Sequence, residues 1–301
     1  MLALRYHRFG GPEIMGVEDA PEPHAGPGQV RVAVRATSVN PFDWKLRAGY
    51  MAELVPISFP AIPGTDAAGV VDEVGDGVEG VAVGDAVFGL GSATAAQFAV
   101  LDLVATKPDN MSFVQAAALG LAVETAARTL DRLVLRDGDT LLVDGAAGGV
   151  GSAMVQLARA RGLNVIGTAS QGHHEYLRSL DARPTTYGPG LSERVAALAP
   201  DGLAGAVDVV GLGSVPTLIE IVGDPGRVAT VADFTAYGLG VHVADTSTGR
   251  AEYALADAVR LFTDGAFVIR IEQTFPISDG PQAHHLSQQG HVAGKLVLTL
   301  P

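Results

Sequence analysis

One loop constrains the fold of this chain more than any other segment, the run GAAGGVG at residues 145–151. It follows the apolar segment LLVD and precedes a helix-like segment that begins AMVQLARARG. Glycines here permit a tight turn, and the N-terminus of the following helix offers free N–H groups and a partial positive charge to a phosphate. A second strand-like segment, NVIGTAS (164–170), completes a β–α–β unit, so the run predicts a dinucleotide site.

The segments on either side of this unit indicate two kinds of architecture. Before about residue 115 the chain has short strand-like runs separated by turns, such as QVRVAVRATSV (29–39), which is typical of an antiparallel β domain. One long helix is expected over 114–133, and strands then alternate with helices up to RVATVAD (227–233). This alternation predicts a doubly wound parallel sheet, and the fold class is α/β.

Composition and charge exclude several classes of function. The 301 residues include no cysteine, which excludes disulfides, thiolate metal sites and cysteine nucleophiles. The formal net charge of −13 disfavours nucleic acid and anionic membranes as partners. We expect no signal peptide, because the N-terminal run MLALRYHRFGGPE has charges from residue 5 onward and no long apolar core. We expect no membrane span, because no apolar run reaches the roughly 18–20 residues that a span requires. A soluble, cytoplasmic protein is the expectation.

The end of the second strand of the nucleotide unit discriminates between cofactors. Sites for the unphosphorylated dinucleotide usually place Asp or Glu there, to bind the ribose 2′-hydroxyl. No acidic residue occurs here from Val165 to His174. Ser170 and His174, with Arg178 as a second cationic candidate, suit a 2′-phosphate instead. We therefore expect NADPH; the alternative for His174 is an exposed helix start with a solvated side chain.

Several stretches along the whole chain carry a family resemblance. They are NPFDWKLRAG (40–49), PGTDAAGVVDEVG (63–75), VGDAVFG (83–89), LAVETA (121–126), GAAGGVGSAMVQLA (145–158), Tyr187 and GHVAGKLVL (290–298). With them the chain resembles the medium-chain dehydrogenase/reductases, and within them the zinc-independent quinone and enone reductases. The resemblance implies a GroES-like catalytic domain, residues 1–115 and 266–301, that is split around a Rossmann NADP-binding domain, residues 116–265. It also implies a homodimer.

The resemblance also implies a site without a metal. Zinc members of the family carry a His-Glu pair where this chain has Thr65 and Asp66, and a cysteine where it has Asn40. Without a Lewis acid, alcohol oxidation loses its means of polarising oxygen, and hydride addition to an enone, alkenal or quinone is the reaction that remains. The histidine pairs 173–174 and 284–285 are expected on the solvated surface, because adjacent side chains point apart.

Three residues in or beside the stretch NPFDWKLRAG (40–49) are the catalytic candidates that the resemblance supplies. Asn40 and Lys45 belong to the segment that lines the active cleft in the relatives, and Tyr50 is a candidate for a wall of the substrate site. Each has a structural alternative: Asn40 caps a turn before Pro41, Lys45 is a surface lysine, and Tyr50 is a surface tyrosine. Asp43 is expected to hold Lys45 or the loop rather than to take part in chemistry.

The cofactor-binding residues expected from the loop and from the resemblance are distributed along the chain. Tyr187 is expected at the 2′-phosphoribose end, and the others lie in the loop or near the nicotinamide. The full set is Lys45, Thr125, Gly148, Gly149, Val150, Ser170, His174, Tyr187, Phe267, Val268, Gly294 and Lys295.

The function predicted from the sequence is NADPH-dependent reduction of the activated C=C bond of enones or alkenals, or of quinones, by hydride transfer without a metal. The alternatives are a catalytically silent NADPH-binding protein and a biosynthetic tailoring reductase for one specific enone. The loops that would shape the substrate site are short and bland in composition, so the sequence predicts no individual substrate.

Overall fold

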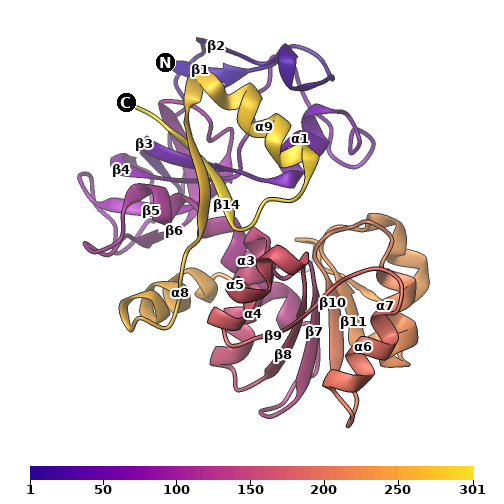
Figure 1. Ribbon diagram of the computed structural model, residues 1–301. Coiled ribbons are helices and arrows are strands. Elements are labelled where there is room, and N and C mark those ends of the chain that lie inside the picture. The colour runs from indigo at the N-terminus through magenta and orange to yellow at the C-terminus, as the bar shows by residue number, and fades with distance from the viewer. Residues whose placement is uncertain (248) are drawn as a thin grey trace. The chain divides into compact units, whose positions relative to one another are not determined.

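The computed structural model describes residues 1–247 and 249–301, and within it the chain forms two units. Unit 1 consists of Met1–Leu121 with Leu255–Pro301, and unit 2 is Ala122–Ala254. Figure 1 shows, within unit 1, the yellow C-terminal helix α9 (Gly280–Gln289) beside α1 (Pro41–Arg47) near the start of the chain. The domain bounds expected from the sequence, 115/116 and 265/266, stay a prediction.

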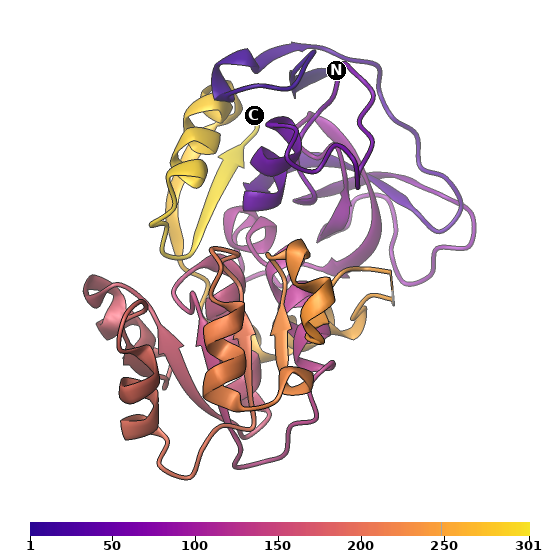
Figure 2. The ribbon, with the colours of Figure 1, turned by 90° about the vertical axis from the view of Figure 1, so that its right-hand side faces the viewer.

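Unit 2 contains one parallel sheet with the strand order β12-β11-β10-β7-β8-β9. The sheet has the doubly wound α/β form that the alternating pattern predicts. In Figure 2 the orange helix α7 lies over the strands β10 and β11. The strands are β7 (Thr140–Asp144), β8 (Asn164–Thr168), β9 (Arg183–Thr185), β10 (Gly205–Asp208), β11 (Val228–Thr230) and β12 (His242–Val243), and the helices are α3 (Gly120–Leu130), α4 (Gly149–Ala160), α5 (His174–Ser179), α6 (Leu191–Leu198) and α7 (Val215–Val222).

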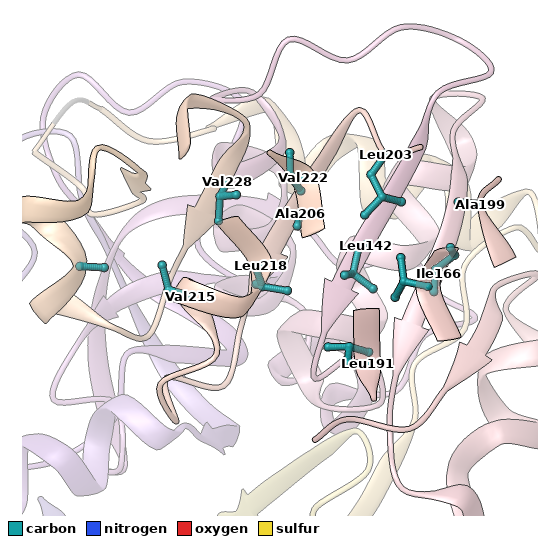
Figure 3. Packing of buried hydrophobic residues seen from close by; sticks show 12 residues of the cluster. Leu142, Ile166, Leu191, Ala199, Leu203, Ala206, Val215, Leu218, Val222 and Val228 are labelled. Atoms are coloured by element: carbon teal, nitrogen blue, oxygen red, sulfur yellow. The ribbon is translucent and has the colours of Figure 1, made fainter. Parts of the chain in front are cut away.

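The core of unit 2 explains why its strands are apolar along their whole length. Parallel strands covered by helices are buried on both faces, so they lack the alternation of a half-exposed strand. Figure 3 shows Leu142 and Ile166 on neighbouring strands, with Leu191 of α6 and Leu218 and Val222 of α7 in the same cluster. All five side chains are buried. This packing fixes the carboxyl end of β7, where the glycine loop begins.

Unit 1 is built on a sheet with the order β13-β14-β3-β4-β5-β6, in which β3 also pairs with β6. Because β3 pairs with both β4 and β6, the four strands from β3 to β6 close into a small barrel. The remaining elements are the hairpin β1–β2, helices α2 and α8, and short 3-10 turns. Bounds are β1 (Leu2–Arg5), β2 (Gly16–Asp19), β3 (Val30–Val39), β4 (Asp66–Val74), β5 (Ala86–Ser92), β6 (Phe98–Thr106), β13 (Ile271–Pro276), β14 (Lys295–Thr299), α2 (Phe113–Ala117) and α8 (Tyr253–Thr263).

The single helix expected over 114–133 is wrong, because the structure has two helices there, α2 and α3. Ser112 caps α2 by accepting a hydrogen bond from the Gln115 N–H, and the second helix starts at Gly120. A Cβ at Gly120 would lie 3.0 Å from the Gly89 carbonyl oxygen, so β5 passes close to the junction. Among the described residues, no helix has both the length and the apolar character needed to cross a membrane.

Candidate active site

Three strand ends of unit 1 meet at one place and bring together Asn40, Asp66 and Lys295. Strand register causes the meeting, because β3 aligns Thr37 with Ala67 of β4 and Val39 with Leu296 of β14. The residue after β3, the first residue of β4 and the first residue of β14 are therefore neighbours. All three side chains are buried, with exposures of 3%, 0% and 6%.

The carboxylate of Asp66 is the centre of this polar cluster. It accepts hydrogen bonds from the Ser38 hydroxyl at 2.6 Å, from Asn40 Nδ2 at 3.1 Å and from the Leu121 N–H at 3.2 Å. Lys295 Nζ lies 3.9 Å from Asp66 Oδ2 and donates to Asn40 Oδ1. Burial lowers the pKa of the Lys295 ammonium, while the carboxylates of Asp66 and Asp43 act in the opposite direction.

The amide of Asn40 is held by this cluster, at the start of the helix that follows it. An ammonium group is only a donor, so its contact requires Oδ1 of Asn40 to face Lys295. Nδ2 then donates to Ser38 Oγ at 3.2 Å and to Asp66. Asn40 is also the N-cap residue of α1 and forms a capping box with Asp43, so the expected alternative of a cap before Pro41 agrees with its place in the cluster. Its role as a donor to substrate stays a prediction.

Asp43, in the first turn of α1, joins the same cluster from its other side. Its Oδ2 accepts the Asn40 N–H at 2.8 Å, and its Oδ1 accepts the Thr65 hydroxyl at 3.3 Å. Burial raises the pKa of the Asp43 carboxyl to about 7; the Asn40 N–H bond opposes the shift, and Asp66 adds to it. The cluster therefore holds two buried carboxyl groups and one ammonium.

Lys45 and Tyr50 occupy the other face of α1 and the turn after it. Lys45 is half-buried, and its Nζ lies 6.0 Å from the centre of the Trp44 ring. Tyr50 is 72% exposed and packs edge-to-face on the same tryptophan, with ring centres 5.9 Å apart. The structure thus brings together Asn40 and Lys295 in the buried cluster, and Lys45 and Tyr50 around Trp44.

The candidates that precede Lys295 differ in exposure. Phe267 is buried, whereas Val268 is 56% exposed. Gly294 has a φ of +90°, and a Cβ there would lie 2.3 Å from the Arg270 carbonyl oxygen. The same carbonyl accepts the Lys295 N–H at 3.0 Å, so Gly294 permits the backbone contact that fixes the start of β14.

In unit 2, the glycine loop turns sharply between β7 and α4. Gly145 has a φ of +86°, and a Cβ on Gly151 would lie 2.2 Å from the Gly145 carbonyl oxygen. The Thr168 hydroxyl accepts the Gly145 N–H at 2.9 Å and donates to Asp144, which ties the loop to β8. Gly148 precedes the helix and has no side chain to cap its first N–H groups. The loop therefore fits the pyrophosphate of a dinucleotide.

The residues expected around a 2′-phosphate follow β8 and β9. Ser170 is exposed, and His174 is half-buried at the start of α5, with Nε2 3.4 Å from the Ala169 carbonyl oxygen. Tyr187 is 55% exposed. Arg178 forms an ion pair with Glu175 at 2.8 Å. Ser170 follows the carboxyl end of β8 and Tyr187 follows that of β9, so both lie at the carboxyl edge of the parallel sheet.

A buried ion pair beside Thr125 is a feature that the sequence analysis missed. Arg128 bonds Glu124 through Nε at 2.8 Å and through Nη2 at 3.1 Å, and its Nη1 donates to the Ala244 and Asp245 carbonyls. Glu124 also accepts the Ala251 N–H at 3.2 Å. The i, i+4 spacing of Glu124 and Arg128 is the signal that could have revealed the pair. Thr125 itself is buried, and its carbonyl accepts the Thr129 hydroxyl.

The expectation that His284 and His285 both lie on the solvated surface is wrong for His284. Its side chain is 1% exposed, because α9 packs this face against the core of unit 1 near Arg47. Burial, with a smaller effect of the Arg47 charge, lowers the pKa of His284 to about 3. His285 is exposed and contacts Gln289.

Two family models match the chain. The alcohol dehydrogenase GroES-like domain matches residues 26–120, and the zinc-binding dehydrogenase model matches residues 186–298. A zinc ion does not fit the cluster, because an amide, a hydroxyl and one carboxylate replace the nitrogen and sulfur ligands that zinc prefers, and the Lys295 ammonium already contacts two of the three. The described residues contain no group of three or more His, Cys, Asp or Glu side chains that could hold a metal.

Known proteins match over different lengths. In an alignment of 310 positions that covers 94% of this chain, it is 36% identical to a pikromycin polyketide synthase component of Streptomyces venezuelae, but it spans only 8% of that protein. It is 39% identical to a quinone oxidoreductase of Rattus norvegicus (56% of this chain, 53% of the relative) and 38% identical to a 2-methylene-furan-3-one reductase of Solanum lycopersicum (60% and 50%). The chain thus aligns with about half the length of these two reductases.

Several solved structures match over the whole chain. The quinone oxidoreductase from Coxiella burnetii has a TM-score of 0.87 and 28% sequence identity, and the match covers 100% of this chain and 99% of that one. The two family models, the relatives and this fold agree with the motifs quoted above. The chain belongs to the medium-chain dehydrogenase/reductases, in their quinone oxidoreductase group.

Proposed function

We propose that this chain is an NADPH-dependent reductase of enones, alkenals or quinones that works without a metal. The observation that carries the proposal is the buried cluster, in which the Lys295 ammonium contacts Asn40 and Asp66. These are two of the three positions at which zinc members carry metal ligands. The rat and tomato relatives, by their names, support a quinone and an enone respectively as substrate classes.

The cofactor supplies the hydride, so the chain has to bind, orient and stabilise charge. Hydride addition builds negative charge on the carbonyl oxygen of the substrate. A buried ammonium such as that of Lys295 favours a nearby negative charge, since a low local dielectric strengthens the interaction. Lys45 and Tyr50 are proposed to contact the substrate or the nicotinamide ribose. Direct donation by Asn40 requires exchange of one of its two internal Nδ2 bonds.

The cofactor is proposed to bind along the carboxyl edge of the unit 2 sheet. The N–H groups of Gly148, Gly149 and Val150 suit the pyrophosphate, and Ser170 and His174 suit the 2′-phosphate. The absence of an acid from Val165 to His174 supports NADPH over NADH. The other cofactor contacts proposed are those of Thr125, Tyr187, Phe267, Val268, Gly294 and Lys295.

The test is oxidation of NADPH and NADH, measured side by side with a quinone, an open-chain enone and an alkenal as acceptors. We expect turnover with at least one acceptor, and kcat/KM for NADPH at least about tenfold above that for NADH, the factor that one charge-assisted contact supplies. Binding of NADPH, followed by its fluorescence, with no turnover of any acceptor would contradict the proposal and favour a catalytically silent NADPH-binding protein.

The likeness to a polyketide synthase component over 94% of the chain favours a second candidate, a tailoring reductase for one biosynthetic enone. It uses the same chemistry and the same residues. A polyketide-type enone that is turned over at least a hundredfold faster than every member of the panel would support this candidate. Comparable rates across the panel would contradict it.

Assembly and location are proposals from the family. We propose a cytoplasmic homodimer. Light scattering during gel filtration measures the mass in solution, and the mass of a single chain would contradict the dimer.

A further inference from the structure

We propose that Asp43 and Thr65 deliver the proton that completes reduction. The Asp43 carboxyl holds this proton, and the Thr65 hydroxyl transfers it to the substrate. The proposal rests on the proposed reductase function. It assigns to Asp43 a role different from the one expected from the sequence, which was to hold Lys45 or the loop. It also names the group that supplies the proton, which neither the family models nor the relatives identify.

The reaction requires a proton that the cofactor does not bring. The bound cofactor would supply a hydride, that is, one proton with two electrons. A new C–H bond forms at the β-carbon of an enone or alkenal, or a new C–H or O–H bond on a quinone, while the C=O electron pair moves onto the carbonyl oxygen to give an enolate or a hydroquinone anion. The anionic oxygen takes the Thr65 hydroxyl proton while the Thr65 oxygen takes the Asp43 proton, and the enol formed from an enone or alkenal then tautomerises to the saturated carbonyl product. Water reprotonates the Asp43 carboxylate after product leaves.

The two carboxyl groups of the cluster have different surroundings, and this difference assigns the proton to Asp43. Asp66 accepts three hydrogen bonds and lies 3.9 Å from the Lys295 ammonium, an arrangement that suits an ionised carboxylate. Within the described part of the chain, the hydrogen bonds given to Asp43 come from two neutral donors, the Asn40 N–H and the Thr65 hydroxyl. One ammonium for two buried carboxyl groups leaves one of them favoured in its protonated form.

The charged and titratable groups that face Asp43 come from several elements. Asp66 begins β4, Lys295 begins β14, and Tyr6 follows β1. Arg47, from the same helix as Asp43, acts on Tyr6. Burial raises the pKa of Asp43 to about 7, so the carboxyl is close to half-protonated at neutral pH, more protonated below it, and able to give up its proton readily.

Thr65 is the residue that transfers the proton to the substrate, because it is partly exposed and held in a fixed position. Asn40, Asp43, Asp66 and Lys295 are buried, whereas Thr65 is only half-buried. A hydroxyl donates and accepts, so the 3.3 Å contact that runs from Thr65 to an ionised Asp43 runs in reverse when Asp43 carries the proton. The Thr65 carbonyl accepts the Gly91 N–H at 3.0 Å, which holds the residue in place.

The experiment compares the pH dependence of wild type, Asp43→Asn, Thr65→Val and Thr65→Ser, each at saturating NADPH with one accepted quinone or enone. We expect wild-type kcat to fall above about pH 7, where Asp43 loses its proton. Asp43→Asn should lower kcat by about 10²–10⁴ and remove this pH limb, with KM little changed. Thr65→Val should lower kcat in the same way, and Thr65→Ser, which keeps the hydroxyl, should restore most of it.

A second measurement reads the proton without turnover. Infrared difference spectra over pH 5–9 should show a protonated carboxyl band that disappears with a midpoint near pH 7, is absent in Asp43→Asn and persists in Thr65→Val. NADPH fluorescence identifies folded variants. If wild type is active but Asp43→Asn keeps full kcat, or if wild type is active but lacks the carboxyl band, proton delivery by Asp43 and Thr65 is overturned while the proposed function stands. A wild type that binds NADPH without turning over any acceptor refutes the proposed function, and the delivery step with it.

Discussion

Each unit contains a buried ionic cluster, and the two clusters are built in opposite ways. In unit 2, Glu124 and Arg128 lie one turn apart on α3 and meet through two hydrogen bonds of 2.8 and 3.1 Å. In unit 1, Asp66 and Lys295 come from strands at opposite ends of the chain and lie 3.9 Å apart. The first pair has one cation for one anion; the second has an additional carboxyl, that of Asp43.

The difference suggests different roles: the pair of unit 2 stabilises the fold, whereas the cluster of unit 1 has an additional carboxyl that can exchange a proton. The remaining bonds of Arg128 go to the Ala244 and Asp245 carbonyls, so the pair ties the segment after β12 to α3. The cluster of unit 1 holds a carboxyl whose pKa is raised to about 7 by burial. Groups with such shifts are concentrated at functional sites.

The largest effect is expected from breaking the unit 2 pair. Arg128→Met leaves the buried Glu124 carboxylate without its cation and should lower the free energy of unfolding by about 3–5 kcal/mol. Urea denaturation measures the change. The double variant Glu124→Leu with Arg128→Met is the matched control and should recover most of the loss, because both charges are removed together. A loss under about 1 kcal/mol in the single variant would contradict the structural role assigned to the pair.

The two clusters also differ in how far the sequence predicts them. The spacing of Glu124 and Arg128 is local, so the pair can be inferred from the helix pattern alone. The contact of Lys295 with Asn40 and Asp66 depends on the register of β14 against β3, which no local pattern determines. The sequence has only three lysines, Lys45, Lys107 and Lys295, and this scarcity is what indicates that Lys295 has a functional role.

The same distinction applies to the fold. The α/β pattern and the loop at 145–151 are predicted correctly, because strand, glycine turn and helix follow each other along the chain. The break between α2 and α3 is not, since it depends on the approach of β5 to Gly120. The burial of His284 likewise depends on which face of α9 packs against unit 1. Contacts between distant segments set both features.

A smaller effect is expected on the pH dependence of stability, and it sharpens the contrast between the clusters. Asp43 has a pKa of about 7 in the folded chain and an ordinary value of 3.8 otherwise, so the folded state binds the proton more tightly. Stability therefore falls as pH rises from about 4 to 7. Asp43→Asn should remove this fall and gain about 2–4 kcal/mol relative to wild type between pH 5 and pH 8, as measured by urea denaturation.

The control for this measurement is Asp76→Asn, which removes an exposed carboxylate on the same unit. Its pH dependence should match that of wild type. If the free energy of unfolding changes with pH equally in Asp43→Asn and in wild type between pH 5 and pH 8, Asp43 is ionised throughout this range. That result would contradict a proton held by the Asp43 carboxyl.

The smallest effect on stability is expected from an ion pair whose shortest N···O distance equals that of the Arg128 pair but which lies at the surface. Arg178 and Glu175 are 2.8 Å apart, and their side chains are 55% and 90% exposed. Because water solvates both partners, Arg178→Gln should change the free energy of unfolding by under about 0.5 kcal/mol. If the Arg178 guanidinium also contacts the 2′-phosphate, the dissociation constant for NADPH should rise about tenfold while that for NADH stays constant. Fluorescence titration with both cofactors measures this. A large loss of stability in Arg178→Gln would show that the N···O distance, rather than burial, sets the strength of these ion pairs. Equal affinities of the variant and wild type for NADPH would assign the phosphate contact to Ser170 and His174 without Arg178.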